Sequence, residues 1–130
     1  MNDAEIIELI TRRHRQLLVH SFLYYKMNES IIPDATFDAW CKELVVLHEK
    51  YRSIAEKATY YEICKDFDSS GSGYFIRGYP EGIMITAIRL LYHHNNKRTP
   101  IEELFSRVGL RILTGNEEKK PKKKTRRKNK

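Results

Sequence analysis

The sequence has no long apolar run and only two cysteines, Cys41 and Cys64, in 130 residues. No stretch has the length and hydropathy typical of a transmembrane helix, and the N-terminus lacks the pattern of a secretory signal. Neither cysteine stands at a spacing to another cysteine or to a histidine that is typical of a zinc site, so we expect no metal. We therefore expect a protein of the reducing cytoplasm, with no membrane partner and with both thiols buried.

Most of the chain also has no net charge. Residues 117–130 contain nine Lys or Arg and two Glu, a net charge of +7, which leaves residues 1–116 with fifteen charges of each sign. The length is typical of one domain. We predict a folded domain over residues 1–115 and a disordered polybasic tail over 116–130, because the tail has no large apolar side chain that could join a core.

The tail is expected to bind nucleic acid, because closely spaced cations displace the counterions of a polyanion. A nuclear import signal and a solubilising tail without a specific partner are the alternatives. The cations predicted to bind nucleic acid are Lys119, Lys120, Lys122, Lys123, Lys124, Arg126, Arg127, Lys128 and Lys130.

Apolar periodicity predicts an all-α fold, a small bundle of about five helices. The first is expected over residues 3–27, capped by Asn2 or Asp3 and with Glu5 in its first turn. Its opposite side has four bases, which we interpret as a solvated face in preference to a phosphate contact. They are Arg12, Arg13, Arg15 and Lys26.

The second helix is expected to follow Pro33, with Asp34 as its N-cap and Trp40 in its apolar stripe. A third is predicted over residues 55–67, followed by a flexible turn and a short extended piece at residues 74–76. Pro80 opens the fourth helix, which ends at the His93–Asn96 segment. Residues 99–102, Thr-Pro-Ile-Glu, form a capping box with proline at the first helical position of the fifth helix, which Gly109 is expected to end.

The most informative segment joins the first two predicted helices. It has the sequence Leu-Tyr-Tyr-Lys-Met-Asn-Glu-Ser-Ile-Ile-Pro-Asp-Ala-Thr-Phe-Asp over residues 23–38. Because the turn is short, the aromatic and acidic side chains on both sides of it are expected to converge on one small pocket. Aromatic faces beside carboxylates suit a flat cationic ring carrying a ribose, as in a nicotinamide nucleotide. The residues of this predicted site are Tyr24, Tyr25, Asp34, Phe37 and Asp38.

The same segment resembles the N-terminal Ia domain of bacterial NAD+-dependent DNA ligases. In that family two helices are joined by Tyr-Tyr/His, several residues and Ile-(Pro/Ser)-Asp-x-x-(Tyr/Phe)-Asp, and the resemblance extends here from about Leu17 through Tyr51. It implies closure over the nicotinamide mononucleotide (NMN) half of NAD+, with the family's contacts falling on Tyr24, Asp34 and Asp38. Tyr25 stands where many members have histidine. Phe37 stands where many have tyrosine, so one hydroxyl is missing.

A ligase also needs a nucleophilic lysine in a Lys-x-Asp-Gly setting to hold AMP covalently, and the sequence contains no such motif. We therefore expect a non-catalytic accessory module that acts in DNA transactions by binding NAD, NMN or a protein partner, with the tail as a nucleic-acid tether. The alternative is an interaction protein or inhibitor, such as phages encode, that targets a host replication, repair or transcription factor in the host cytoplasm. In that case Tyr24, Tyr25 and Phe37 would pack the helix junction.

Overall fold

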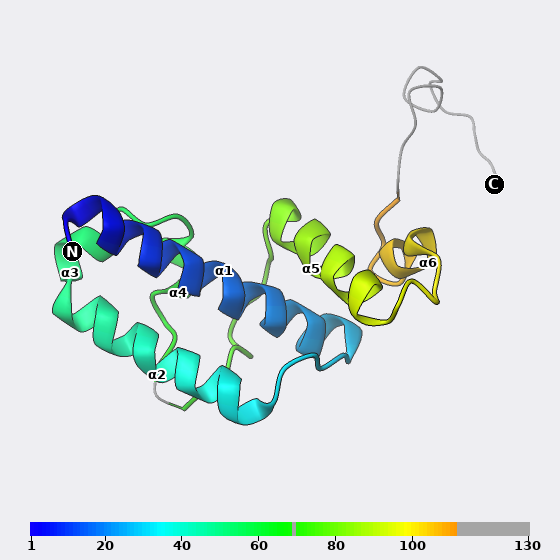
Figure 1. The fold of residues 1–130 in the computed structure, drawn as a ribbon, viewed down its shortest axis with the longest axis horizontal. Helices are drawn as coiled ribbons and strands as arrows, with labels where there is room; N and C mark the ends of the chain where they lie inside the picture. Colours follow the sequence, from blue (N-terminus) through cyan, green and yellow to red (C-terminus); the bar gives the residue numbers. More distant parts are fainter. Residues whose placement is uncertain (69, 112–130) are drawn as a thin grey trace, which may run out of the picture.

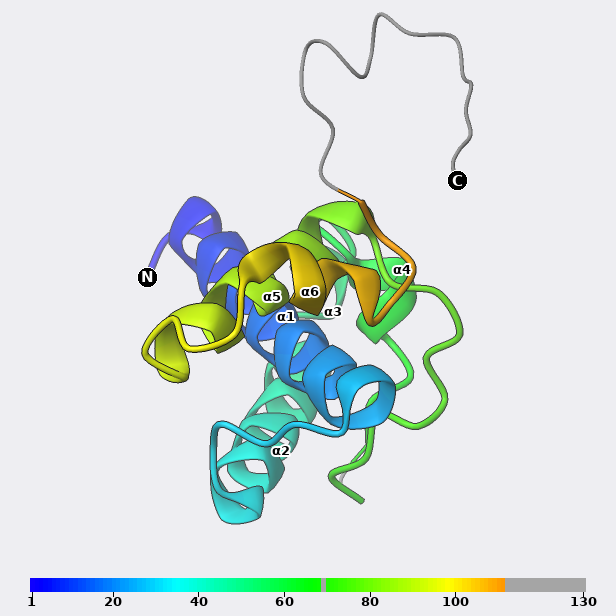
Figure 2. The same ribbon diagram turned by 90° about the vertical axis from the view of Figure 1, so that its right-hand side faces the viewer.

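The computed structural model describes residues 1–68 and 70–111, and every regular element within these ranges is helical. The long helix α1 (Asp3–Met27) lies between α2 (Asp34–Lys50) and α5 (Glu81–His94), as both views of the ribbon show (Figures 1 and 2). The one-turn helices α3 (Arg52–Ala55) and α4 (Tyr61–Cys64) also contact α1, and α6 (Ile101–Ser106) packs on α5. The predicted all-α fold is confirmed, with six helices in residues 1–68 and 70–111 where about five were expected for the chain.

Helix α1 is the centre of the core because α2 and α5 cover different sides of it. Three consecutive residues, Leu17, Leu18 and Val19, are all buried, which a helix with a single covered face would not allow. Its start is the predicted one: the Asn2 side chain accepts from the Glu5 amide, and the Glu5 carboxylate accepts from the Asn2 amide. At its end Asn28 adopts the left-handed conformation, with φ of 56°.

Helix α2 begins at the predicted position, but the predicted N-cap is wrong. Pro33 is the N-cap, its carbonyl accepts from the amide of Phe37 at 3.2 Å, and Asp34 is the first helical residue. The Asp34 carboxylate makes no capping hydrogen bond. The predicted capping box at residues 99–102 is also wrong, because Pro100 is the N-cap of α6, no side chain caps the helix, and Thr99 lies outside it.

The predicted third helix over residues 55–67 is wrong. The chain there forms the two single turns α3 and α4, separated by Tyr60 in the left-handed region with φ of 69°. Contacts with α1 explain the break: the Thr59 amide donates to the Thr11 hydroxyl, and the Thr59 carbonyl accepts from the His14 imidazole. Both backbone groups of Thr59 are therefore unavailable to a continuous helix.

The predicted extended piece at residues 74–76 is also wrong, because the segment forms a turn in which the Ile76 amide donates to the Gly73 carbonyl. Helix α5 ends at His94, close to the predicted position. Gly109, with φ of 78°, follows α6 as expected, and the Leu110 amide donates to the Phe105 carbonyl across it.

Both cysteines are buried and free, as predicted. None of the helices that the structure describes combines the length and hydropathy that crossing a bilayer requires. The C-terminal part of the predicted domain, the predicted tail and its nine cations lie outside the described residues.

Candidate functional site: a pocket at the α1–α2 junction

A pocket of about 320 Å³ lies where α1 ends and α2 begins. Its wall comes from the last two turns of α1, the connecting segment, the first turns of α2 and the loop at residues 70–71. The lining residues are His20, Ser21, Tyr24, Tyr25, Glu29, Ser30, Ile31, Ile32, Asp34, Phe37, Asp38, Ser70 and Gly71. All five residues of the site predicted from the sequence are in this wall.

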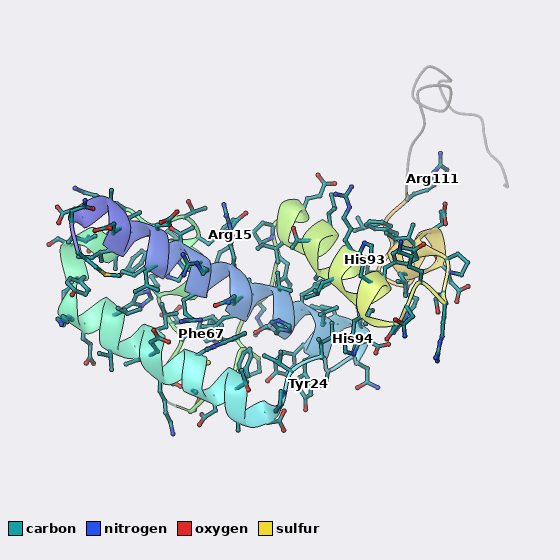
Figure 3. All side chains as sticks on the ribbon, in the orientation of Figure 1. Arg15, Tyr24, Phe67, His93, His94 and Arg111 are labelled. Atoms are coloured by element: carbon teal, nitrogen blue, oxygen red, sulfur yellow. The ribbon has the colours of Figure 1, made fainter. Side chains whose placement is uncertain are left out.

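The two tyrosines are adjacent on the last turns of α1, and Figure 3 shows Tyr24 beside the connection to α2. Their rings meet edge to face, with centroids 4.9 Å apart, and 54% of Tyr24 and 43% of Tyr25 are exposed. The Tyr25 hydroxyl shares a hydrogen bond of 3.0 Å with the Ser72 hydroxyl, which fixes that ring against the loop. Tyr24, which is more than half exposed and part of the pocket wall, is accessible to a ligand.

Phe37 has a different environment. It is half-buried, packs against the hydrophobic core, and meets the ring of Phe67 edge to face with centroids 6.5 Å apart. It thus packs the junction, as the alternative interpretation of the sequence required, while still forming part of the pocket wall. The hydroxyl that tyrosine would add at this position is absent.

The wall of the pocket has three carboxylates and, among the described residues, no lysine or arginine. The Asp38 carboxylate pairs with Lys42 one turn further along α2 at 3.1 Å, and the Glu29 carboxylate lies 3.3 Å from the Arg107 guanidinium. Asp34 forms no ion pair or hydrogen bond through its carboxylate within the described part of the chain. Its charge is the least compensated in the pocket.

The loop that closes one side of the pocket approaches α2 so closely that it needs glycine. Gly71 has φ of 73°, and a Cβ added there would collide with the Asp38 carboxylate. Gly73 is similarly close to the Ser21 hydroxyl. The loop is far from the tyrosines in sequence, so the pattern around residues 23–38 did not predict it. The glycine and serine content of the loop indicated only a flexible turn.

Two further wall residues, His20 and Ser21, lie one helical turn before the tyrosine pair. That spacing of three or four residues is a signal in the sequence that could have identified them. His20 packs beside Trp40, with ring centroids 5.8 Å apart, and burial lowers the pKa of its imidazole. The Ser21 side chain is buried, and its hydroxyl has no hydrogen-bond partner.

A second polar cluster lies further along the α1–α2 interface, outside the pocket. Nδ1 of the buried His14 lies 2.7 Å from the Thr59 carbonyl, so a neutral His14 donates from Nδ1 and accepts at Nε2 from His48 at 2.8 Å. Burial, with a smaller effect of the His48 charge, lowers the pKa of His14 from 6.5 to about 4. The pair is therefore neutral at physiological pH.

The cysteines do not supply a reactive group to the pocket. Burial, followed by the charges of Asp38 and Asp68, raises the pKa of Cys41 to about 12. Burial also raises the pKa of Cys64, so both thiols are protonated. No group of three or more metal-ligating side chains occurs in the part of the chain that the structure describes.

The four bases predicted on one side of α1 separate into two kinds. Arg12, Arg15 and Lys26 are exposed, and Figure 3 shows Arg15 on the side of α1 away from α2. Arg13 instead turns towards α2, where its guanidinium pairs with Glu43 at 2.8 Å and lies 5.5 Å from the Trp40 ring centroid. Arg13 is therefore a packing residue of the α1–α2 interface.

The fold and the site together define an all-α protein with an acidic, aromatic pocket at a helical hairpin. Comparisons of the chain with protein-family models, with curated proteins and with solved structures give no match. The resemblance to the ligase Ia domain therefore stays a prediction from the residues that suggested it.

Proposed function

We propose that this protein is a non-catalytic module that binds the nicotinamide half of NAD+ or NMN in the pocket at the α1–α2 junction. The observation that supports it is the convergence of Tyr24, Tyr25, Asp34, Phe37 and Asp38 on one wall. These residues come from the end of α1 and the start of α2, so the fold of the hairpin brings them together.

The chemistry of the wall suits this ligand. A volume of about 320 Å³ lies in the range of small-molecule sites. The exposed ring of Tyr24 offers a π face to a pyridinium cation, an arrangement that is favourable when the cation is partly desolvated. Carboxylates such as Asp34 and Asp38 accept strong hydrogen bonds from ribose hydroxyls and oppose the positive charge of the ring.

Calorimetric titration of the full chain with NMN and with NAD+ at physiological ionic strength tests this proposal. We expect saturable binding that Tyr24→Ala weakens by about tenfold, since a stacked aromatic contributes on the order of 1 kcal/mol or more. Tyr74→Ala is the matched control, because Tyr74 is also an exposed tyrosine but lies outside the pocket.

AMP, which has a phosphate but no pyridinium ring, controls for attraction of the ligand to the basic tail. Absence of binding at millimolar NMN would contradict the proposal, as would equal affinities of the Tyr24 and Tyr74 variants.

We also propose that the tail tethers the protein to nucleic acid, in the cytoplasm and beside a protein partner in replication, repair or transcription. The density of cations in residues 119–130 supports the tether. The two buried, free cysteines are consistent with a reducing compartment. An interaction protein that uses only the tail and the helical surface is the competing function.

Electrophoretic mobility shifts at several salt concentrations test the tether. Changing Lys122, Lys123 and Lys124 together to glutamine should reduce the slope of log affinity against log salt by up to about three for duplex DNA. Changing the exposed Arg12 and Arg15 to glutamine is the control and should leave the slope nearly unchanged. An unchanged slope for the tail variant would exclude the tail as the main contact.

A further inference from the structure

We infer that the outward face of α5 is a contact surface for nucleic acid, which binds the phosphate backbone through cations of the folded domain. This goes beyond the proposed function, because it assigns a nucleic-acid surface to the described part of the chain and requires neither the nicotinamide site nor the tail. It follows from the exposure pattern of α5, from the charges along that face and from the place where the described chain ends.

Helix α5 buries one side against α1 and exposes the other. The buried residues are Ile83, Ala87, Ile88 and Leu91. From residue 86 onwards the exposed positions recur at spacings of three and four, so they form one stripe along the helix. The α5 stripe consists of Thr86, Arg89, Leu90, His93 and His94, followed directly after the helix by Lys97 and Arg98.

The charges of the α5 stripe are of one sign. Residues 82–101 contain three Lys or Arg and two His but no Asp or Glu. Arg89, Lys97 and Arg98 form no ion pair and no side-chain hydrogen bond with any residue that the structure describes. This holds even for the two acids in the first turn of α6, which follow closely in sequence. Exposed arginine and lysine side chains are the usual donors to phosphate oxygens, and here their charge is uncompensated.

The backbone at Lys97 is unusual for a lysine. Asn96 and Lys97 both lie in the left-handed region, with φ of 57° and 60°. The Lys97 amide donates to the Tyr92 carbonyl at 2.9 Å and so terminates α5. Glycine would adopt this conformation without strain, whereas a side chain there costs about 1 kcal/mol. A role of the side chain in binding accounts for a cation at a position where the backbone alone favours glycine.

The surroundings of the α5 stripe favour nucleic acid over other anionic partners. Helix α6 packs on α5, and Figure 3 shows His93, His94 and Arg111 at the same end of the molecule. The cations of residues 119–130 follow in the sequence, so a strand bound by them would have a high effective concentration at the stripe. A lipid surface fits poorly, because Leu90 is the one large apolar side chain in the stripe.

Electrophoretic mobility shifts of the full chain with duplex DNA at several salt concentrations test this inference. Changing Arg89, Lys97 and Arg98 together to glutamine should reduce the slope of log affinity against log salt by up to about three, because each phosphate contact contributes about 0.9. The matched control changes three other exposed cations to glutamine and should reduce the slope by less than about one. These are Lys50, Arg52 and Lys57, around α3, which Figure 1 shows at the end of the fold opposite to α6.

Single changes at Lys97 separate binding from folding. Lys97→Gly removes the cation but suits the left-handed backbone, so the urea unfolding midpoint should stay the same or rise. Affinity for DNA should nevertheless fall by about threefold, the effect of one phosphate contact. Lys97→Arg, which keeps the charge, should retain the affinity. Equal affinities of the wild type and the glycine variant would contradict a contact at this residue.

The outcomes separate this inference from the proposed tether. If the stripe variant and the control variant weaken DNA binding equally, the α5 stripe is overturned. If only the change of Lys122, Lys123 and Lys124 alters the slope, the tether is supported and the stripe is again overturned, which would leave it as a surface for an acidic protein. If only the stripe variant alters the slope, the stripe is supported and the tether fails.

Discussion

The positions of the five predicted pocket residues are set by the ends of two helices that are close in sequence. Tyr24 and Tyr25 lie on the last turns of α1, and Asp34, Phe37 and Asp38 lie on the first turns of α2, separated by a turn of only a few residues. The positions of these side chains relative to each other depend mainly on two helix ends and one connection. This is why the residue pattern alone was sufficient to predict that they would meet.

The rest of the wall depends on contacts distant in sequence. Ser70 and Gly71 reach the pocket from the loop before α5, and Arg107 from the end of α6 contacts Glu29 and donates to the Met27 carbonyl at 2.7 Å. No periodicity or capping signal encodes such contacts, because they depend on how separate elements pack. The charge balance of the pocket was therefore accessible only from the structure.

Gly71 gives a residue-scale prediction. Gly71→Ala should destabilise the fold by about 1–2 kcal/mol, because any other residue is strained at a left-handed position. The added Cβ would also displace Asp38, so NMN affinity should fall. Gly78→Ala is the control, since a Cβ there meets nothing within 4 Å. Equal unfolding midpoints in urea for the two variants would contradict this account of the loop.

At the scale of elements, strong local signals predicted the long helices and failed for the short ones. Helices α1, α2 and α5 have clear apolar periodicity and lie close to their predicted bounds. Residues 55–67 also have apolar periodicity, yet Thr59 binds Thr11 and His14 on α1 and the helix breaks there. A few tertiary hydrogen bonds thus outweighed a weak helical preference over a short segment.

The His14–His48 pair gives a prediction at the α1–α2 interface. The pKa of His14 is lower in the folded chain, about 4, than its ordinary 6.5, so below pH 6.5 the unfolded chain takes up the proton more readily. The stabilisation is complete above pH 6.5 and is lost as the pH falls towards 4, by up to about 3 kcal/mol. Tyr61, whose ring is 5.4 Å from that of His48, and the buried Cys64 are the other titratable neighbours.

Urea unfolding measured at intervals between pH 7.5 and 4.5 checks this dependence. His14→Gln should lower stability at neutral pH and flatten the profile, because the group that titrates is removed. The exposed His93 is the control, and His93→Gln should keep the steep profile. A wild-type profile that is flat between pH 6.5 and 4.5 would contradict the role of the buried pair.

At the scale of the whole molecule, two kinds of charge are separated along the chain. Residues 1–116 are neutral and contain the acidic pocket, while the net charge of +7 belongs to residues 117–130. A cationic ring and a polyanion would therefore bind to different parts of one chain. Arg107, the residue that follows α6, also contacts the pocket residue Glu29. The two binding functions that we propose therefore belong to segments far apart in sequence, residues 20–38 and 70–71 for the pocket and residues 119–130 for the tail.

The most direct test of the central claim is a titration of isotope-labelled full-length protein with NMN, followed by two-dimensional amide NMR spectra. The account predicts saturable shifts for Tyr24, Ser30, Asp34, Asp38 and Gly71, which surround the pocket from four segments. Tyr74 and the α5 surface around Leu90 should not shift. Shifts confined to residues 117–130, or the absence of shifts at millimolar NMN, would contradict the claim that this junction is a nicotinamide site.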